Sequence, residues 1–72
     1  WNKRTREGFE RGIASFQQAI EKDPSYALAW SGLADSNLGL AFYHHAAPHD
    51  ALPRAREAAL KALQIDGALA AA

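Results

Sequence analysis

Apolar residues return at helical intervals in three separate segments of the chain. In the first segment they are spaced four, three and four residues apart, along one side of a helix: Phe9, Ile13, Phe16 and Ile20. Thr5 stands before this segment as a candidate N-cap, and the pair Asp23 and Pro24 follows it. Because the residue before a proline is pushed out of the helical region, the helix should stop there. The pattern predicts a helix over residues 6–22.

The second segment begins after Ser25 and should reach about Phe42 as a helix. Its apolar residues lie mainly on one side: Tyr26, Trp30, Leu33 and Leu40. Only a short linker separates it from the first segment, so the two helices must form an antiparallel hairpin.

The third segment is bounded by Asp50, the better N-cap candidate, and by Gly67, which should mark the helix end. Pro53 then falls in the first turn, where its missing N–H does no harm. The side expected to be buried is mostly alanine, so this helix should lie close to its neighbours: Leu52, Ala55, Ala59, Ala62 and Leu63. The sequence therefore predicts an all-α fold of three antiparallel helices. Its expected core has six members: Phe16, Ile20, Trp30, Leu33, Ala59 and Leu63.

Two nine-residue segments of the sequence resemble each other. Residues 19–27 read AIEKDPSYA and residues 62–70 read ALQIDGALA, each after an amphipathic helical segment. Self-similarity at a fixed period of this size is typical of helical repeat arrays, in which each unit buries its apolar face against its neighbours. Such proteins usually present a binding surface and catalyse nothing themselves.

The residues around these two segments resemble the tetratricopeptide repeat, a helix–turn–helix unit with the pattern W-x2-L-G-x2-Y, then A-x3-F and a closing proline. The second half of one unit is matched by four residues: Gly12, Phe16, Ala19 and Pro24. The next unit is matched by a further set: Trp30, Leu33, Ala34, Ala55 and Ala62. The chain departs from the pattern at Asn37 and Ala59, where aromatic residues are usual, and at Gly67, where the closing proline normally stands.

The resemblance implies a single segment, residues 1–72, that is a fragment of an α–α superhelix. Residues 5–24 would be the second helix of one repeat, and residues 25–67 would be a full repeat with an insertion near 43–52. Residues 68–72 would start a further repeat. The chain lacks an initiating methionine and stops where another repeat helix should begin, so we expect it to be part of a longer protein.

In stacked helix pairs, the first helix of each unit lines the concave groove. The resemblance gives that role to the second predicted helix, with four partner-binding residues: Leu28, Ser31, Asp35 and Leu38. Some members of the family hold a peptide carboxylate with a Lys and an Asn at the places of Ser31 and Asp35, and Asp35 would repel such a group. We therefore expect a basic or amphipathic helical ligand. The alternative is that Leu28 and Leu38 pack against another repeat.

Composition argues against several other classes of protein. The chain has no cysteine, so neither a disulfide framework nor a zinc finger is expected. Its eight basic residues equal its eight acidic ones, so no overall field draws it to nucleic acid or membrane. No apolar run has the length of a membrane span. The local basic cluster is most simply a solvated helix face: Lys3, Arg4, Arg6 and Arg11.

Only one group of metal-ligand residues clusters in the sequence: His44, His45, His49 and Asp50. Adjacent helical residues point about 100° apart and Pro48 interrupts the segment, so a solvated loop is expected, with a metal site and a histidine pH switch as minor alternatives. A hydrolase would need Ser31 or Ser36 with Asp35 and a histidine, and no nucleophile elbow surrounds either serine.

The sequence thus predicts a non-enzymatic protein-interaction module that uses no cofactor. Its sequence is similar in general character to the tetratricopeptide segments of bacterial, cytoplasmic signalling proteins. The expected partner is a protein or peptide, not nucleic acid or membrane. Apolar Phe9, Ile13 and Leu69 at the open repeat ends favour either a homodimer or an isolated segment that is only marginally folded. A second hypothesis is a regulatory or spacer segment of a signalling enzyme such as a nucleotide cyclase or a kinase.

Overall fold

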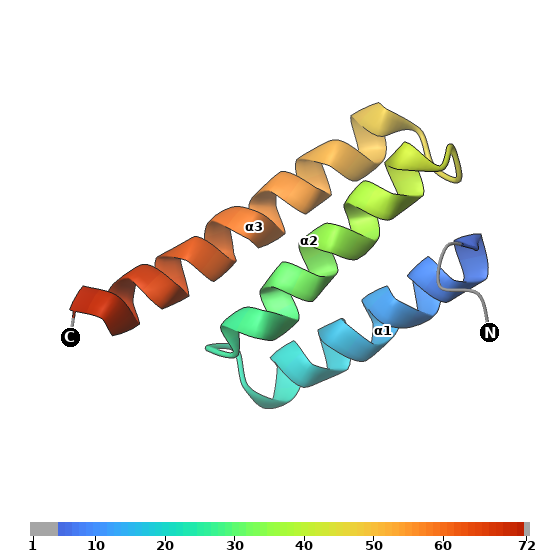
Figure 1. The fold of residues 1–72 in the computed structure, drawn as a ribbon. Coiled ribbons are helices and arrows are strands. Elements are labelled where there is room, and N and C mark those ends of the chain that lie inside the picture. The colour runs from blue at the N-terminus through green and yellow to red at the C-terminus, as the bar shows by residue number, and fades with distance from the viewer. Residues whose placement is uncertain (1–4, 72) are drawn as a thin grey trace.

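The middle helix of the structure packs against both of the others. The computed structural model describes residues 5–71, with side chains for residues 5–67, as three helices: α1 (Arg6–Lys22), α2 (Ala27–Phe42) and α3 (Pro48–Ala71). Short turns join them, so each helix runs antiparallel to the one before it (Figure 1). α2 contacts α1 and α3, whereas the backbones of α1 and α3 do not approach each other within the described residues. The predicted all-α fold of three helices is confirmed.

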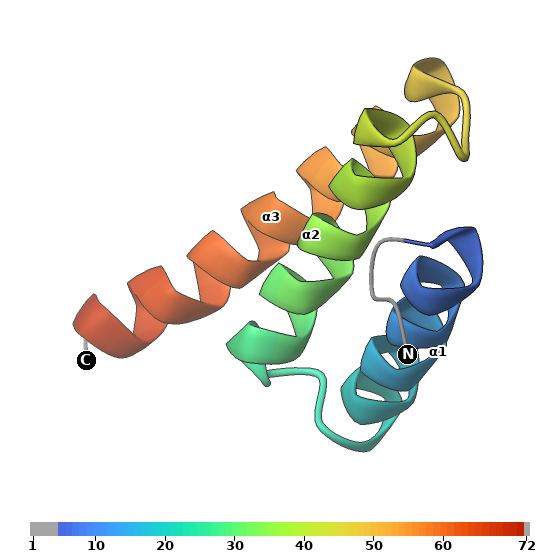
Figure 2. The ribbon, with the colours of Figure 1, turned by 45° about the vertical axis from the view of Figure 1, so that its right-hand side comes forward.

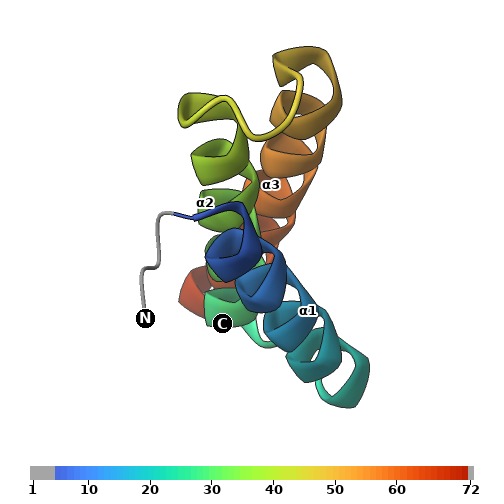
Figure 3. The same ribbon diagram turned by 90° about the vertical axis from the view of Figure 1, so that its right-hand side faces the viewer.

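The three helices form a thin, open arrangement around α2. The molecule extends 39 × 24 × 16 Å along its principal axes. Figure 2 and Figure 3 show α1 inclined to α2, and Figure 1 shows the C-terminal part of α3 extending past the start of α2. With so little thickness, each helix keeps a large part of its surface in solvent.

α1 has the bounds that the sequence predicts, and its cap explains where it begins. The Thr5 hydroxyl accepts a hydrogen bond from the Gly8 backbone N–H at 3.0 Å, which satisfies one of the free donors of the first turn. Glu7 lies in that turn, where its charge suits the positive end of the helix dipole. At the other end, Pro24 pushes the preceding residue out of the helical region, so the helix stops at Lys22.

Side chains fix the turn between α1 and α2. One carboxylate oxygen of Asp23 accepts hydrogen bonds from the backbone N–H and the hydroxyl of Ser25, both at 3.1 Å. The indole N–H of Trp30 donates to the carbonyl oxygen of Pro24 at 2.9 Å, which ties the first turn of α2 to the loop. With the chain held in this turn, α2 begins at Ala27, one residue later than predicted.

Two phenylalanine rings of α1 rest on two glycines of α2. A Cβ atom added to Gly32 would lie closer than 3.0 Å to three ring atoms of Phe16. A Cβ atom added to Gly39 would lie equally close to the ring of Phe9. Real Cβ atoms do not approach other atoms so closely in a packed interior, so each ring fills the space that a side chain on α2 would occupy.

The contact between α2 and α3 is made mostly by alanine. Among residues 5–67, all but one of the buried apolar residues are alanines: Ala29, Ala34, Leu40, Ala41, Ala51, Ala55, Ala58 and Ala62. Those on α3 recur at intervals of four, three and four residues, which is one stripe along the helix. Methyl side chains let helix backbones approach closely, but each buries little area. The core is therefore thin, and no large side chain among the described residues is fully enclosed.

The observed core is shallower than the predicted one. Five of the six predicted core residues are only half-buried: Phe16, Ile20, Trp30, Leu33 and Ala59. The sixth, Leu63, is 67 % exposed, so its predicted burial was wrong. Leu63 directly follows Ala62 and therefore points about 100° away from the buried stripe. Leu52 stands in the same relation to buried Ala51 and is likewise exposed.

α3 is longer at both ends than the sequence predicts. It begins at Pro48, because a proline at the first helical position lacks only an N–H that would have no partner there. Asp50 consequently lies in the first turn and is not the N-cap. The helix passes through Gly67 to Ala71, so the predicted end at Gly67 was wrong and residues 68–71 continue α3. No glycine in the described part of the chain has the positive φ that a helix-ending glycine usually supplies.

Gly32→Ala should destabilise the fold by about 1–2 kcal/mol. Alanine favours a helix over glycine by about 1 kcal/mol, but here its methyl group would collide with the Phe16 ring and displace it. Urea unfolding followed by circular dichroism measures the change in the free energy of unfolding.

Gly67→Ala is the matched control, because Gly67 also lies inside a helix and an added Cβ would meet no atom within 4 Å. It should raise the free energy of unfolding by about 0.5–1 kcal/mol. Equal effects of the two substitutions would contradict the contact between ring and glycine.

Candidate interaction surface

α2 has one face that neither neighbouring helix covers. The four predicted groove residues lie on this face, and Phe42 continues their row: Leu28, Ser31, Asp35, Leu38 and Phe42. Leu28 is 71 % exposed, Leu38 46 % and Phe42 74 %, whereas Ser31 is half-buried. The predicted residues thus share one largely exposed face, and their binding role stays a prediction.

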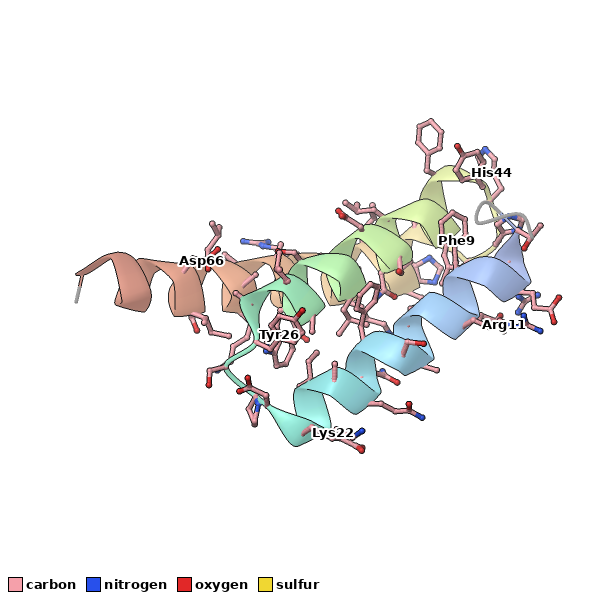
Figure 4. The ribbon with its side chains drawn as sticks, turned by 60° about the horizontal axis from the view of Figure 1, so that its bottom comes forward. Phe9, Arg11, Lys22, Tyr26, His44 and Asp66 are labelled. Atoms are coloured by element: carbon pink, nitrogen blue, oxygen red, sulfur yellow. The ribbon has the colours of Figure 1, made fainter. Side chains whose placement is uncertain are left out.

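A shallow hollow lies beside this row, between α2 and α3. Both helices contribute to its lining: Ser31, Ala34, Asp35 and Leu38 from α2, and Ala59, Ala62, Leu63 and Asp66 from α3. Ala34 and Ala62 are buried, while Leu38 and Leu63 are exposed. Asp66, on the C-terminal part of α3 in Figure 4, was not predicted here. Its spacing of three residues from Leu63 was the available signal, because such residues share a helix face.

A second hollow continues from the first at Leu38, which lines both. The rest of its lining is uncharged: Phe9, Gly39, Ala41, Phe42, Tyr43, Pro48 and Leu52. Phe9 stacks on Tyr43 with ring centroids 5.8 Å apart, and Phe42 meets Tyr43 edge-on at 5.0 Å. Sequence reasoning missed this part of the surface, although Phe42 follows Leu38 by one helical turn. The two joined hollows are named the seam below.

The seam is acidic at one end only. Asp35 and Asp66 are its only charged lining residues, and neither forms an ion pair with another residue in the part of the chain that the structure describes. Arg11 and Lys22 of α1 point away from α2 (Figure 4). A ligand group that faces the two aspartates would therefore meet uncompensated negative charge.

On the opposite side of α2, the neighbouring helices α1 and α3 contribute charged residues of both signs. A crevice there lies between α1 and α3, with Trp30, Leu33, Asn37 and Leu40 along α2. Two arginines and two glutamates also line it: Arg6, Glu10, Arg54 and Glu57. The side-chain amide of Asn37 donates to the Leu33 carbonyl at 2.9 Å, so this buried polar group is satisfied. Neither sign of charge dominates this side.

The predicted basic cluster is partly neutralised. Arg6 is paired with Glu10 at 2.9 Å and Arg11 with Glu7 at 3.2 Å, each one turn away on exposed α1. Lys3 and Arg4 lie outside the described residues. The arginines of α1 therefore offer little net positive charge to a polyanion.

The turn between α2 and α3 breaks the helix where the sequence predicted it. His44 adopts a positive φ of 60°, and the backbone N–H groups of His45 and Ala46 bond back to the Leu40 carbonyl at 2.8 and 3.1 Å. This arrangement satisfies a free carbonyl at the end of α2, as a glycine often does at helix ends. α3 then starts at Pro48.

The three histidines in this turn and at the start of α3 have different surroundings. His44 and His49 are exposed as expected, but His45 is half-buried. The centroid of its ring lies 6.2 Å from that of Phe9 and 6.4 Å from that of Tyr43, so the two aromatic rings cover it. The expectation that all three are solvated was therefore wrong for His45. Among the described residues, no group of three His, Asp or Glu side chains is placed to hold a metal ion.

No family model, curated protein or solved structure matches the chain. None of the helices in its described part combines the length and the apolar content that a bilayer span requires.

Added zinc or nickel should change the melting temperature of the chain by less than about 1 °C. The three histidines do not converge, so the native state should bind the ion no better than the unfolded chain does. Thermal unfolding followed by circular dichroism, with and without the ion, measures this. A rise of several degrees that His49→Ala abolishes would instead establish a metal site between the turn and the start of α3.

Proposed function

We propose that the chain is a non-enzymatic protein-interaction module of the tetratricopeptide type, which binds a protein or peptide along the open face of α2. One observation carries the proposal. Large exposed apolar side chains of both helices line the two joined hollows: Leu38 and Phe42 from α2 and Leu63 from α3, with exposed Leu28 further along α2. Single exposed leucines are ordinary, but a contiguous exposed apolar patch is typical of a contact surface.

The way α2 is held supports this role. α1 fixes the helix through Phe9 and Phe16, and α3 fixes it through the alanine stripe. An element that is packed from two sides keeps its conformation. Binding to its surface therefore costs less conformational entropy than binding to a mobile loop, and affinity is higher for the same contacts. As the resemblance implies, the proposal places the module in a larger cytoplasmic regulatory protein of a bacterium.

A spacer or regulatory segment of a signalling enzyme is the second candidate. The same exposed leucines favour it, because a neighbouring helix pair of the same polypeptide would bury them equally well. The homodimer through open repeat ends has less support. Phe9 and Ile13 are already half-buried under α2, and the side chain of Leu69 lies outside the described residues.

A photoreactive side chain placed at Leu38 of the full-length protein should crosslink to a separate polypeptide in intact cells. Leu38 lines both hollows, so a bound partner would lie within reach of it. Gln64 is the control position, because it is exposed on α3 and lines neither hollow. Mass spectrometry identifies the crosslinked products.

A crosslink from Leu38 into its own polypeptide would favour the spacer. Equal crosslinking from Leu38 and Gln64, or none from Leu38, would contradict the interaction module.

A further inference from the structure

The seam has an acidic end and an apolar end. Asp35 and Asp66 border the hollow that contains Leu63, whereas no residue that lines the hollow around Phe42 is charged. Along α2, Asp35 and Phe42 are two turns apart, which is about 10 Å of helix. A ligand lying along the seam would meet negative charge at one point and an aromatic surface two turns further on.

The shape of the seam suits a helix. Its lining includes the small residues Ala34, Ala59 and Ala62, so the side-chain ridge of another helix can enter between α2 and α3. The residues that line it follow both helices lengthwise, so the ligand would lie along them. The described residues contain no strand whose edge could extend a bound peptide through main-chain hydrogen bonds.

We propose that the seam binds an amphipathic helix with a lysine or arginine at the edge of its apolar side, two turns from a large apolar residue. The cation faces Asp35 and Asp66, and the apolar residue covers Phe42 and the hollow beside Leu52. The proposal rests on the proposed function and names the class of partner for the same surface.

A second copy of the chain fits this surface less well. A symmetric pair sets identical patches against each other. Each patch carries Asp35 and Asp66, with no lysine or arginine among the residues that line it. Neither copy would therefore supply a cation to the aspartates of the other, and four carboxylates would lie at the interface without a basic partner, which disfavours pairing. Charge therefore selects a basic partner over self-association.

Two helical peptides of about 18 residues test the proposal. Both carry leucines and one phenylalanine along one side, and they differ at a single edge position two turns from the phenylalanine, which is lysine in one and glutamate in the other. Fluorescence anisotropy of the labelled peptides measures binding to the whole chain. The lysine peptide should bind about three- to tenfold more tightly at low salt, and the preference should shrink as salt rises.

Substitutions at the two ends of the seam should act differently. The double variant Asp35→Asn with Asp66→Asn should remove the preference, so that both peptides bind alike. Phe42→Ala should weaken both by about fivefold or more, and because Phe42 is mostly exposed, its truncation should leave the fold intact. Leu60→Ala is the matched control, since Leu60 is an exposed leucine of α3 outside the seam. It should leave both affinities unchanged, and circular dichroism checks that every variant is folded.

Equal binding of the two peptides to the unmodified chain would overturn the proposal, as would equal effects of Phe42→Ala and Leu60→Ala. Failure of both peptides to bind would also overturn it. If sedimentation then shows that the unmodified chain is a dimer and that the Phe42→Ala variant is a monomer, the occupant of the seam is a second copy. A crosslink from Leu38 to a separate polypeptide would leave the proposed function standing in each case.

Discussion

Two phenylalanine rings of α1 seated on two glycines of α2 fix how these two helices are placed against each other. Phe9 rests on Gly39 and Phe16 rests on Gly32, and the spacing is two turns in both helices. The matched spacing sets the register of the antiparallel pair, because a shift by one turn would move a ring from glycine onto a residue with a side chain, such as Ser36. In this contact the phenylalanines belong to α1 and the glycines to α2, so the two helices pack together without large side chains from α2.

This packing explains why so much apolar surface remains exposed. Rings over glycines close one side of α2 and alanines close the side toward α3, so neither contact uses the large side chains that stand on the remaining face. Leu28, Leu38 and Phe42 therefore face solvent in the described part of the chain. The helix that holds the molecule together is also the helix that offers the surface, and a partner would bind to the most firmly packed element.

Sequence patterns predicted the features that depend on few neighbouring residues, such as the Thr5 cap and the stop at Pro24. They were weaker for α3, because alanines occur on several sides of this helix and periodicity alone does not say which of them are buried. Leu63 was placed in the core for that reason, one position away from the buried stripe. On the candidate surface, Leu38 and Asp35 were predicted from the resemblance together with the register of one helix. Asp66 was not, because it joins them only when α3 is packed on α2.

Nuclear magnetic resonance of a chain with labelled phenylalanine and glycine measures which ring of α1 contacts which glycine of α2, and so tests the register of the two helices directly. Nuclear Overhauser contacts should join the Phe9 ring to the Hα atoms of Gly39 and the Phe16 ring to those of Gly32, with ring-current shifts on both glycines. Gly67, which has no neighbour within 4 Å of an added Cβ, should show no ring contact. Contacts from Phe9 to Gly32 would mean that α1 lies in another register. If the glycines show no ring contact at all, α1 covers another face of α2 and the open face is not the one described.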